Sequence, residues 1–146
     1  ATEPELKQKK QMFEDSLNST KAALEEGIVP GGGVALLRAT KALKSLKLEG
    51  EEAIGAKIVL ASCEAPIKQI IANTGFDPSV VLAEVLAAQP EFGFNANTEK
   101  VENMIHAGVI DPLKVLRNSL TNAASVAGIV LLSEVLIADA PEDDEE

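Results

Sequence analysis

Apolar residues recur at helical spacing along most of the chain, beginning within its first two dozen positions. There they stand seven, four and seven residues apart, at Leu6, Phe13, Leu17 and Leu24. This spacing forms one narrow stripe on an otherwise polar helix. Thr2 followed by Glu5 matches a capping box, and Gly27 is a typical stop signal. We therefore predict a connecting helix that ends at about Glu26 and packs on a neighbour along one seam.

Further segments with a helical pattern are separated by glycine and proline. Asp77-Pro78 and Asp111-Pro112 each combine an N-cap residue with a proline suited to the first helical turn. Pro66 falls inside an apolar helical pattern and is expected to kink it. We predict helices from the glycines at 31–33 to about Leu46, from about Glu51 to Asn73, from Pro78 to near Ala88, and one or two after Asp111.

The segment from Gln89 to Gly108 differs in character from the rest of the chain. It contains two of the four phenylalanines, and the runs 92–94 and 101–105 have the pattern of a small β-hairpin. Residues 135–137 are expected to form a short edge strand. The predicted fold class is therefore mainly α, a helical bundle with a small β-hairpin.

Composition narrows the class of protein. The chain has 146 residues, enough for about one domain. Aromatic residues make up only 3% of it, so we expect an aliphatic core. The net charge of −10 argues against a nucleic-acid surface. The single Cys63 cannot form an internal disulfide and indicates a reducing compartment.

The longest apolar stretch, 123–138, is shorter than the roughly 20 residues of a membrane span, so we expect a buried helix and no membrane contact. The acidic run at 140–146 is expected to be a disordered tail.

Three consecutive glycines, Gly31 to Gly33, stand directly before a predicted helix. A glycine loop at a helix N-terminus can accommodate a phosphate, a ribose or another backbone. The alternative is a flexible connector, and spacing alone favours that alternative.

Other candidate residues also have a structural and a functional interpretation. Asp15 points about 200° away from the apolar stripe, which fits a solvated carboxylate or a base brought to a site elsewhere. The run 95–97, Asn-Ala-Asn, fits a turn or contacts to a base edge or ribose. Asp111 fits a helix N-cap that could also hold ribose hydroxyls. His106 and Cys63 fit structural roles, since neither has metal-ligand neighbours at a suitable spacing. The sequence predicts no metal site and has no phosphate-binding Gly-x-x-x-x-Gly-Lys-Ser/Thr loop.

Several motifs, in order along the chain, resemble the group I chaperonins, the family of GroEL. They are EEGIVPGGGVALLR at 25–38, EAPIKQII at 64–71, DPSVV at 77–81, FGFNA at 92–96, GVIDP at 108–112 and AASVAG at 123–128. The resemblance extends in register to about Asp139. It implies a C-terminal fragment of a subunit: residues 1–27 from the intermediate domain and residues 28–139 from the C-terminal half of the equatorial domain.

The resemblance also implies roles for individual residues. Asp15 matches the aspartate that helps position the attacking water, and Gly32 matches a nucleotide-contacting glycine. Asn95, Ala96 and Asn97 fall where the family contacts adenine, although the third position is commonly Ala. Asp111 matches the aspartate that holds the ribose. Gly32 would thus be a wall on the adenosine side, near a hinge, and not a phosphate cradle.

The implied function is ATP-driven folding of non-native proteins in a homo-oligomeric double ring. The phosphate loop, the magnesium ligand and the apical domain that binds clients and co-chaperonin would lie in the N-terminal part. The resemblance therefore implies ATP and Mg²⁺ as cofactors. It also implies that the protein acts in a bacterial cytoplasm or, alternatively, in a mitochondrial matrix or plastid stroma. The tail departs from the Gly-Gly-Met repeats common in bacterial members. The alternative function is that of a non-enzymatic helical module that self-associates, and we expect the isolated chain to hydrolyse no ATP.

Overall fold

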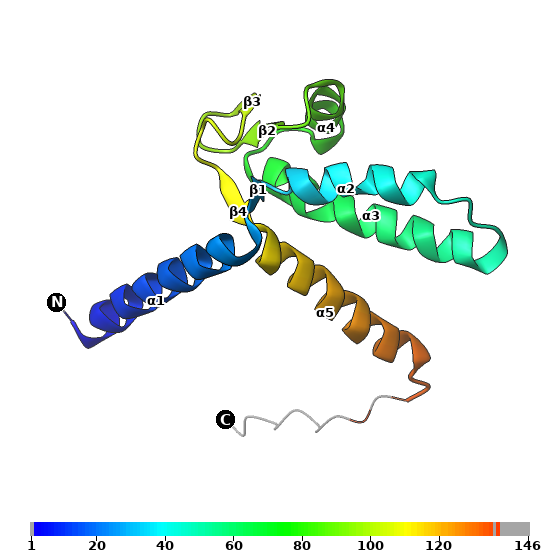
Figure 1. Cartoon of the computed structure of the whole chain (residues 1–146), viewed down its shortest axis with the longest axis horizontal. Coiled ribbons are helices and arrows are strands. Elements are labelled where there is room, and N and C mark those ends of the chain that lie inside the picture. Colours follow the sequence, from blue (N-terminus) through cyan, green and yellow to red (C-terminus); the bar gives the residue numbers. More distant parts are fainter. Residues whose placement is uncertain (1, 136, 138–146) are drawn as a thin grey trace, which may run out of the picture. The chain divides into compact units, whose positions relative to one another are not determined.

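A computed structural model describes residues 2–135 and 137 (Figure 1). The chain divides into two compact units, Ala1–Leu116 and Arg117–Glu146. The elements are α1 (Glu3–Glu26), β1 (Ile28–Pro30), α2 (Val34–Ser45), α3 (Gly50–Asn73), α4 (Pro78–Ala87), β2 (Phe92–Asn95), β3 (Lys100–Asn103), β4 (Ile110–Pro112) and α5 (Leu113–Leu132). The mainly helical fold class and the β-hairpin agree with the prediction. The predicted acidic tail at 140–146 lies outside the described residues.

Helix α1 begins and ends where the capping signals indicate. The backbone N–H of Thr2 donates to Glu5 Oε2 at 2.8 Å, and Gly27 ends the helix with a φ of +84°. The predicted seam, however, is not covered by any described residue. Its four apolar side chains are 56% to 83% exposed. At the C-terminal end of α1, Lys114 donates to the Glu25 carboxylate in a partly exposed ion pair.

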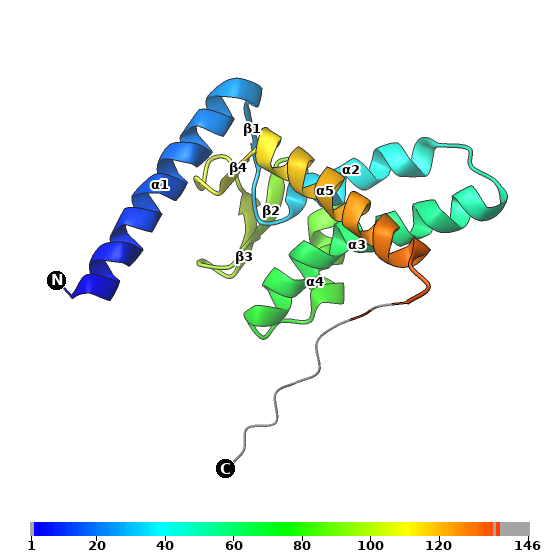
Figure 2. The same ribbon diagram turned by 90° about the horizontal axis from the view of Figure 1, so that it is seen from below.

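The core of the first unit lies where α2, α3 and α4 meet the hairpin (Figure 2). It is aliphatic apart from one phenylalanine, as the composition predicts. Its fully buried side chains include Leu37, Ile67, Ile71, Val85 and Met104. Cys63 is also buried, and that burial raises the pKa of its thiol, which fits an inert core residue.

Two antiparallel pairs of strands complete the first unit. Strands β2 and β3 form the predicted hairpin, with Phe92 opposite Asn103. Strands β1 and β4 pair across more than 80 residues of sequence, and the sequence gives no signal for this pair. The prediction that Asp111 caps the last helix is wrong: Asp111 lies within β4, opposite Val29, and α5 begins two residues later.

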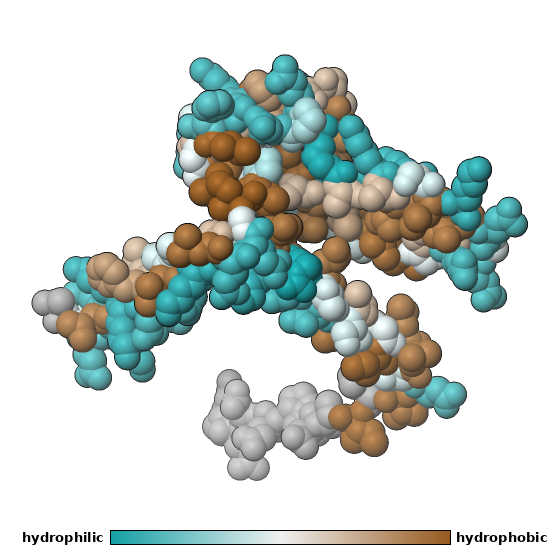
Figure 3. Space-filling view, viewed as in Figure 1, coloured by the Kyte–Doolittle hydropathy of each residue, from teal (hydrophilic) through white to brown (hydrophobic). Residues whose placement is uncertain are grey.

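Helix α5 occupies the segment in which one or two helices are predicted after Asp111, and none of its described side chains is buried. The expectation of a buried helix therefore does not hold within the described chain (Figure 3). By length and composition α5, with a mean hydropathy of 1.3, is long and apolar enough to cross a membrane. Helices α3 and α4 pass the same test only when they are counted together as one span, and they are bent by 119° relative to each other. Core helices of water-soluble proteins pass the same test. Val135 and Ile137 are not in a strand, and Leu136 falls outside the described part.

Candidate functional site

The three glycines allow the chain to turn between two closely packed parts of the first unit. The N–H of Gly31 donates to the carbonyl of Val109 at 2.9 Å, beside β4. Gly33 has a φ of +79°, and a Cβ there would lie 2.8 Å from the backbone nitrogen of Ile67 in α3. Glycine is therefore required because protein backbone approaches from both sides. The close-approach interpretation is supported, and the approaching groups belong to the chain itself.

A cavity of about 220 Å³ opens beside this turn, and we call it the Gly32 cavity. It is lined by Gly32, Ile70, Phe94, Asn95, Ala96, Asn97, Met104 and Val109. Four of these, Gly32 and the run 95–97, are residues that the sequence singled out. They come from two turns more than 60 positions apart, brought together because the hairpin packs over the glycine loop. A Cβ on Gly32 would lie 2.9 Å from Met104 Cε, so glycine keeps this wall of the cavity open.

The side-chain amide of Asn95 is the centre of a hydrogen-bond network at the end of β2. Its Nδ2 donates to Glu102 Oε1 at 2.6 Å, and its Oδ1 accepts the backbone N–H of Asn97 at 3.0 Å. The hydroxyl of Thr98 donates to the same Glu102 oxygen at 2.7 Å. These bonds fix the shape of the turn that carries 95–97. The hydrogen bond from Thr98, then the one from Asn95 and, less strongly, the positive charge of Lys100 lower the pKa of Glu102.

Glu102 is a residue that sequence reasoning missed. It belongs to no motif, and a glutamate in a strand looks like an ordinary surface charge. The pairing of β2 with β3 places it opposite Gly93, diagonal to Asn95. The available signal was the alternation along the hairpin, which puts Glu102 on the same side as Lys100 and within reach of the Asn95 side chain.

Asp111 does not line the Gly32 cavity but lies close to it in the chain. It stands two positions after Val109, which is a lining residue. Asp111 is half-buried, and burial raises the pKa of its carboxyl group. A partly buried carboxylate beside a cavity is a candidate acceptor for ligand hydroxyls.

Asp15 is not brought to the cavity. It is exposed on α1, eleven residues before the helix ends at Glu26, or about 17 Å along the helix axis at 1.5 Å per residue. Among the described residues, no group of three His, Cys, Asp or Glu side chains could hold a metal ion. The described residues therefore do not fit Mg²⁺ as a bound ion.

The lining of the Gly32 cavity suits a flat, partly apolar ring. Ile70, Phe94 and Val109 provide apolar surface, while Asn95 and Asn97 provide amide groups that can read the edge of such a ring. The lining includes no lysine or arginine, so the cavity offers no counter-charge to a phosphate. Its chemistry is recognition and positioning, with no nucleophile or base among the lining residues.

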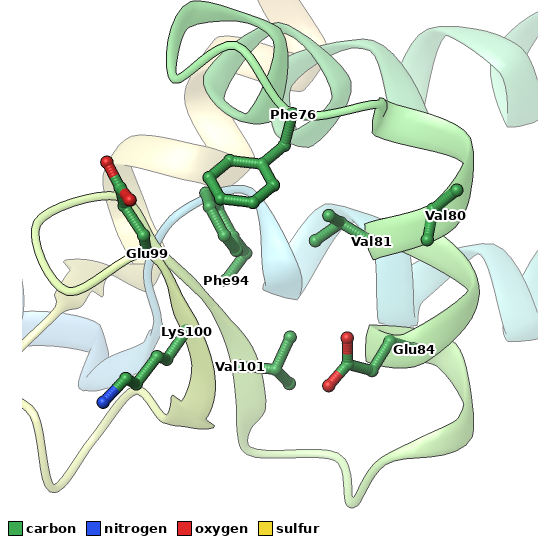
Figure 4. A pocket seen from close by; sticks show the side chains of 8 residues that line it. All are labelled: Phe76, Val80, Val81, Glu84, Phe94, Glu99, Lys100 and Val101. Carbon is green, nitrogen blue, oxygen red and sulfur yellow. The ribbon is translucent and has the colours of Figure 1, made fainter.

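A second hollow, of about 470 Å³, lies on the other side of Phe94 (Figure 4). Phe76 meets Phe94 edge-on there, with ring centroids 5.8 Å apart. Glu84 directs its carboxylate over the apolar floor, whereas Lys100 points away from it. Although this hollow is larger, none of the residues predicted to bind a ligand lines it.

Known chaperonins match this chain over nearly its whole length. The TCP-1/cpn60 chaperonin family matches residues 1–141. Chaperonin GroEL 3 of Protochlamydia amoebophila (strain UWE25) is 75% identical over all 146 residues, which cover 27% of that protein. The crystal structure of a group III chaperonin in the open state matches with a TM-score of 0.84 at 27% identity, over 94% of this chain and 29% of that one. The chain thus spans about a quarter of the length of the curated relative it matches.

Proposed function

The chain belongs to the TCP-1/cpn60 chaperonin family, as its motifs predict, and from this premise we propose that it holds the adenosine side of the ATP site in a chaperonin subunit. The observation that supports this proposal most strongly is the convergence of Gly32 with the run 95–97 on one cavity. These residues are far apart in sequence, and the resemblance assigns nucleotide contacts to each of them.

In this proposal the base occupies the Gly32 cavity, where apolar side chains shield it from water. The amides at 95–97 hydrogen-bond to its edge, and Asp111 accepts hydrogen bonds from the ribose hydroxyls. ATP supplies the phosphoanhydride bond whose hydrolysis drives the folding cycle. The triphosphate and Mg²⁺ are held by segments outside this chain, because the cavity lining has no basic residue and the described residues have no metal-binding cluster.

The second part of the proposal concerns Asp15. Its carboxylate orients the water that attacks the terminal phosphate, and this requires movement of α1 toward the nucleotide. The chain has a suitable pivot, because α1 ends at Gly27 with a φ of +84° before the short strand β1. The Lys114–Glu25 ion pair joins the end of α1 to the start of α5 across that pivot.

The remaining functional proposals concern the intact subunit. Other subunits of a double ring, a co-chaperonin and non-native client proteins are its partners, with clients bound by a domain outside this chain. The place of action is a bacterial cytoplasm, which fits the bacterial source of the 75%-identical relative.

The test of the catalytic role is an Asp15→Ala substitution in the assembled full-length subunit. ATP affinity is expected to stay within about three-fold, while the rate of hydrolysis falls at least about 100-fold, as for a group that acts mainly in the transition state. Glu14→Ala is the matched control, because it removes a neighbouring exposed carboxylate about 100° around the helix. Unchanged turnover in Asp15→Ala would exclude this role.

A second candidate function applies to the chain by itself. Large apolar side chains are exposed on α1, α3 and α5, among them Phe13, Ile54, Ile58, Val130 and Leu131. Such surface favours self-association as a non-enzymatic module. Light scattering and an ATPase assay on the 146-residue chain distinguish the two: we expect oligomers without hydrolysis, and hydrolysis that depends on Asp15 would contradict this expectation.

A further inference from the structure

The second hollow is an open, partly aromatic surface that the proposed nucleotide site does not use (Figure 4). Its volume of about 470 Å³ is within the range of roughly 300 to 1,000 Å³ that is usual for small-molecule sites. Phe94 forms one wall and is only 2% exposed, because it belongs to the core and also lines the Gly32 cavity. This wall is therefore held in place before any ligand binds.

Apolar side chains line the hollow on several sides. Phe76 stands edge-on to Phe94, and it is 43% exposed. Val81 on α4 and Val101 on β3 continue the same surface. A half-exposed ring beside a buried one offers a ligand both an edge and a face, which are the contacts that aromatic groups prefer. The hollow therefore suits a compact aromatic body.

The charge around the hollow is negative. Glu84 directs its carboxylate over the apolar floor, and no hydrogen bond or ion pair joins that carboxylate to another described residue. Glu99 is a second acidic lining residue. Lys100 points away from the hollow, and its positive charge acts on Glu102 instead. The hollow therefore favours a cation and opposes an anion.

We propose that the second hollow binds a small organic cation, an ammonium group carried on an aromatic body. The body packs against Phe76 and Phe94, and the ammonium group donates to the Glu84 carboxylate in a charge-assisted hydrogen bond. Glu84 is exposed, so the bound ammonium group keeps water on its outer side and is not fully desolvated. The site is distinct from the proposed ATP site, because the two sets of lining residues share only Phe94.

Isothermal titration calorimetry of the assembled full-length subunit with three indole compounds tests the charge and the body separately. Tryptamine carries an ammonium group, tryptophol a hydroxyl group and indole-3-propionate a carboxylate on nearly the same body. Saturating ADP is present, so that the probes do not enter the nucleotide site. Tryptamine is expected to bind with a Kd of about 0.1 to 1 mM, as for a ligand of this size. Tryptophol should bind about five- to ten-fold more weakly, and indole-3-propionate should show no measurable binding.

Two substitutions of Glu84 separate this site from binding elsewhere. Glu84→Gln should lower the affinity for tryptamine about five- to ten-fold and leave that for tryptophol unchanged. Glu52→Gln is the control, an exposed glutamate of α3 outside the lining, and should change neither affinity. Glu84→Lys should reverse the preference, so that indole-3-propionate binds and tryptamine does not. Lysine suits this exposed position in the last turn of α4, where the helix dipole favours a positive charge.

A substitution of Phe76 tests the aromatic wall. Phe76→Ala should weaken tryptamine and tryptophol by a similar factor, about three- to ten-fold, because it removes apolar contact from both. Three results would overturn the proposal. They are no binding of tryptamine to the assembled subunit, equal binding of all three indole compounds, and an affinity for tryptamine that neither Glu84→Gln nor Glu84→Lys changes.

Discussion

At the scale of single residues, the glycine run shows how one short motif meets several separate requirements. Gly31 allows contact with Val109, Gly32 leaves room for Met104 at the cavity wall, and Gly33 allows α2 to start against α3. Of the three glycines, only Gly32 lines the Gly32 cavity, so the motif serves mainly to allow close packing of the backbone. The sequence predicts the need for close approach but not which groups approach.

Gly33→Ala is expected to destabilise the fold. The new Cβ would lie 2.8 Å from backbone in α3, and the residue has a φ of +79°, so strain and clash act together. We expect a loss of about 2 to 4 kcal/mol in the free energy of unfolding, measured by urea denaturation. Gly55→Ala is the matched control, because nothing lies within 4 Å of its Cβ position in the second turn of α3. That variant should gain about 0.5 to 1 kcal/mol, and equal losses in both variants would contradict the explanation.

Asp111 leads to a prediction about pH. Burial raises the pKa of its carboxyl group above the ordinary value of 3.8, so the folded protein binds a proton more tightly than the unfolded chain. Its contribution to stability is therefore full at low pH and is lost as the pH rises through the raised pKa. Asp111→Asn should be more stable than wild type at pH 7, and the difference should vanish near pH 3. Urea unfolding at both pH values measures it, with Asp15→Asn, an exposed position, as the control. A larger stabilisation at pH 3 than at pH 7 would refute this sign.

At the scale of elements, helices are predictable here because their signals are local. Thr2 with Glu5, Asp77 with Pro78, and Gly27 mark ends that the structure places within a residue or two. The β1–β4 pair was not predicted because three-residue strands carry little pattern, and their partners are more than 80 positions apart. The same pairing explains the error at Asp111, since its Asp-Pro signal is overridden by strand formation.

The end of α4 depends on a side chain from another helix. Arg38 in α2 donates through Nη2 to the carbonyls of Val85 at 2.7 Å, Ala88 at 3.2 Å and Gln89 at 2.8 Å. It therefore supplements the backbone hydrogen bonds at the end of α4, where the Val85 carbonyl also accepts the Ala88 N–H at 3.3 Å, and places a positive charge at the negative end of the helix dipole.

Arg38→Met should cost about 2 to 3 kcal/mol in the free energy of unfolding, because it leaves several carbonyls without a charged donor while keeping the apolar stem. Arg38→Lys should recover about half of that loss, since an ammonium keeps the charge but cannot reach all three carbonyls at once. Urea denaturation of the three proteins measures both effects. A full loss in the lysine variant would show that charge contributes little, and no loss in either would contradict the capping role.

At the scale of the whole molecule, the chain combines much exposed apolar surface with partial coverage of its relatives. Many apolar side chains of α1, α3 and α5 are exposed, and the chain covers 27% of its 75%-identical relative. The likeness to chaperonins identified Gly32 and 95–97 as site residues, and the structure places them around one cavity. Composition and periodicity alone could not have predicted this, because the residues belong to two separate turns. Glu102 could not be found either way, since its role depends on strand register.

The most direct test of the central claim, that this chain holds the adenosine side of an ATP site, is photolabelling of the assembled full-length subunit with 2-azido-ATP. Trypsin cleaves after Lys68 and Lys100, so the run 95–97 lies in the peptide Gln69–Lys100. We predict that the label is found in this peptide by mass spectrometry and is lost when excess ATP competes. Label confined to other parts of the subunit, or label in this peptide that ATP does not displace, would contradict the account.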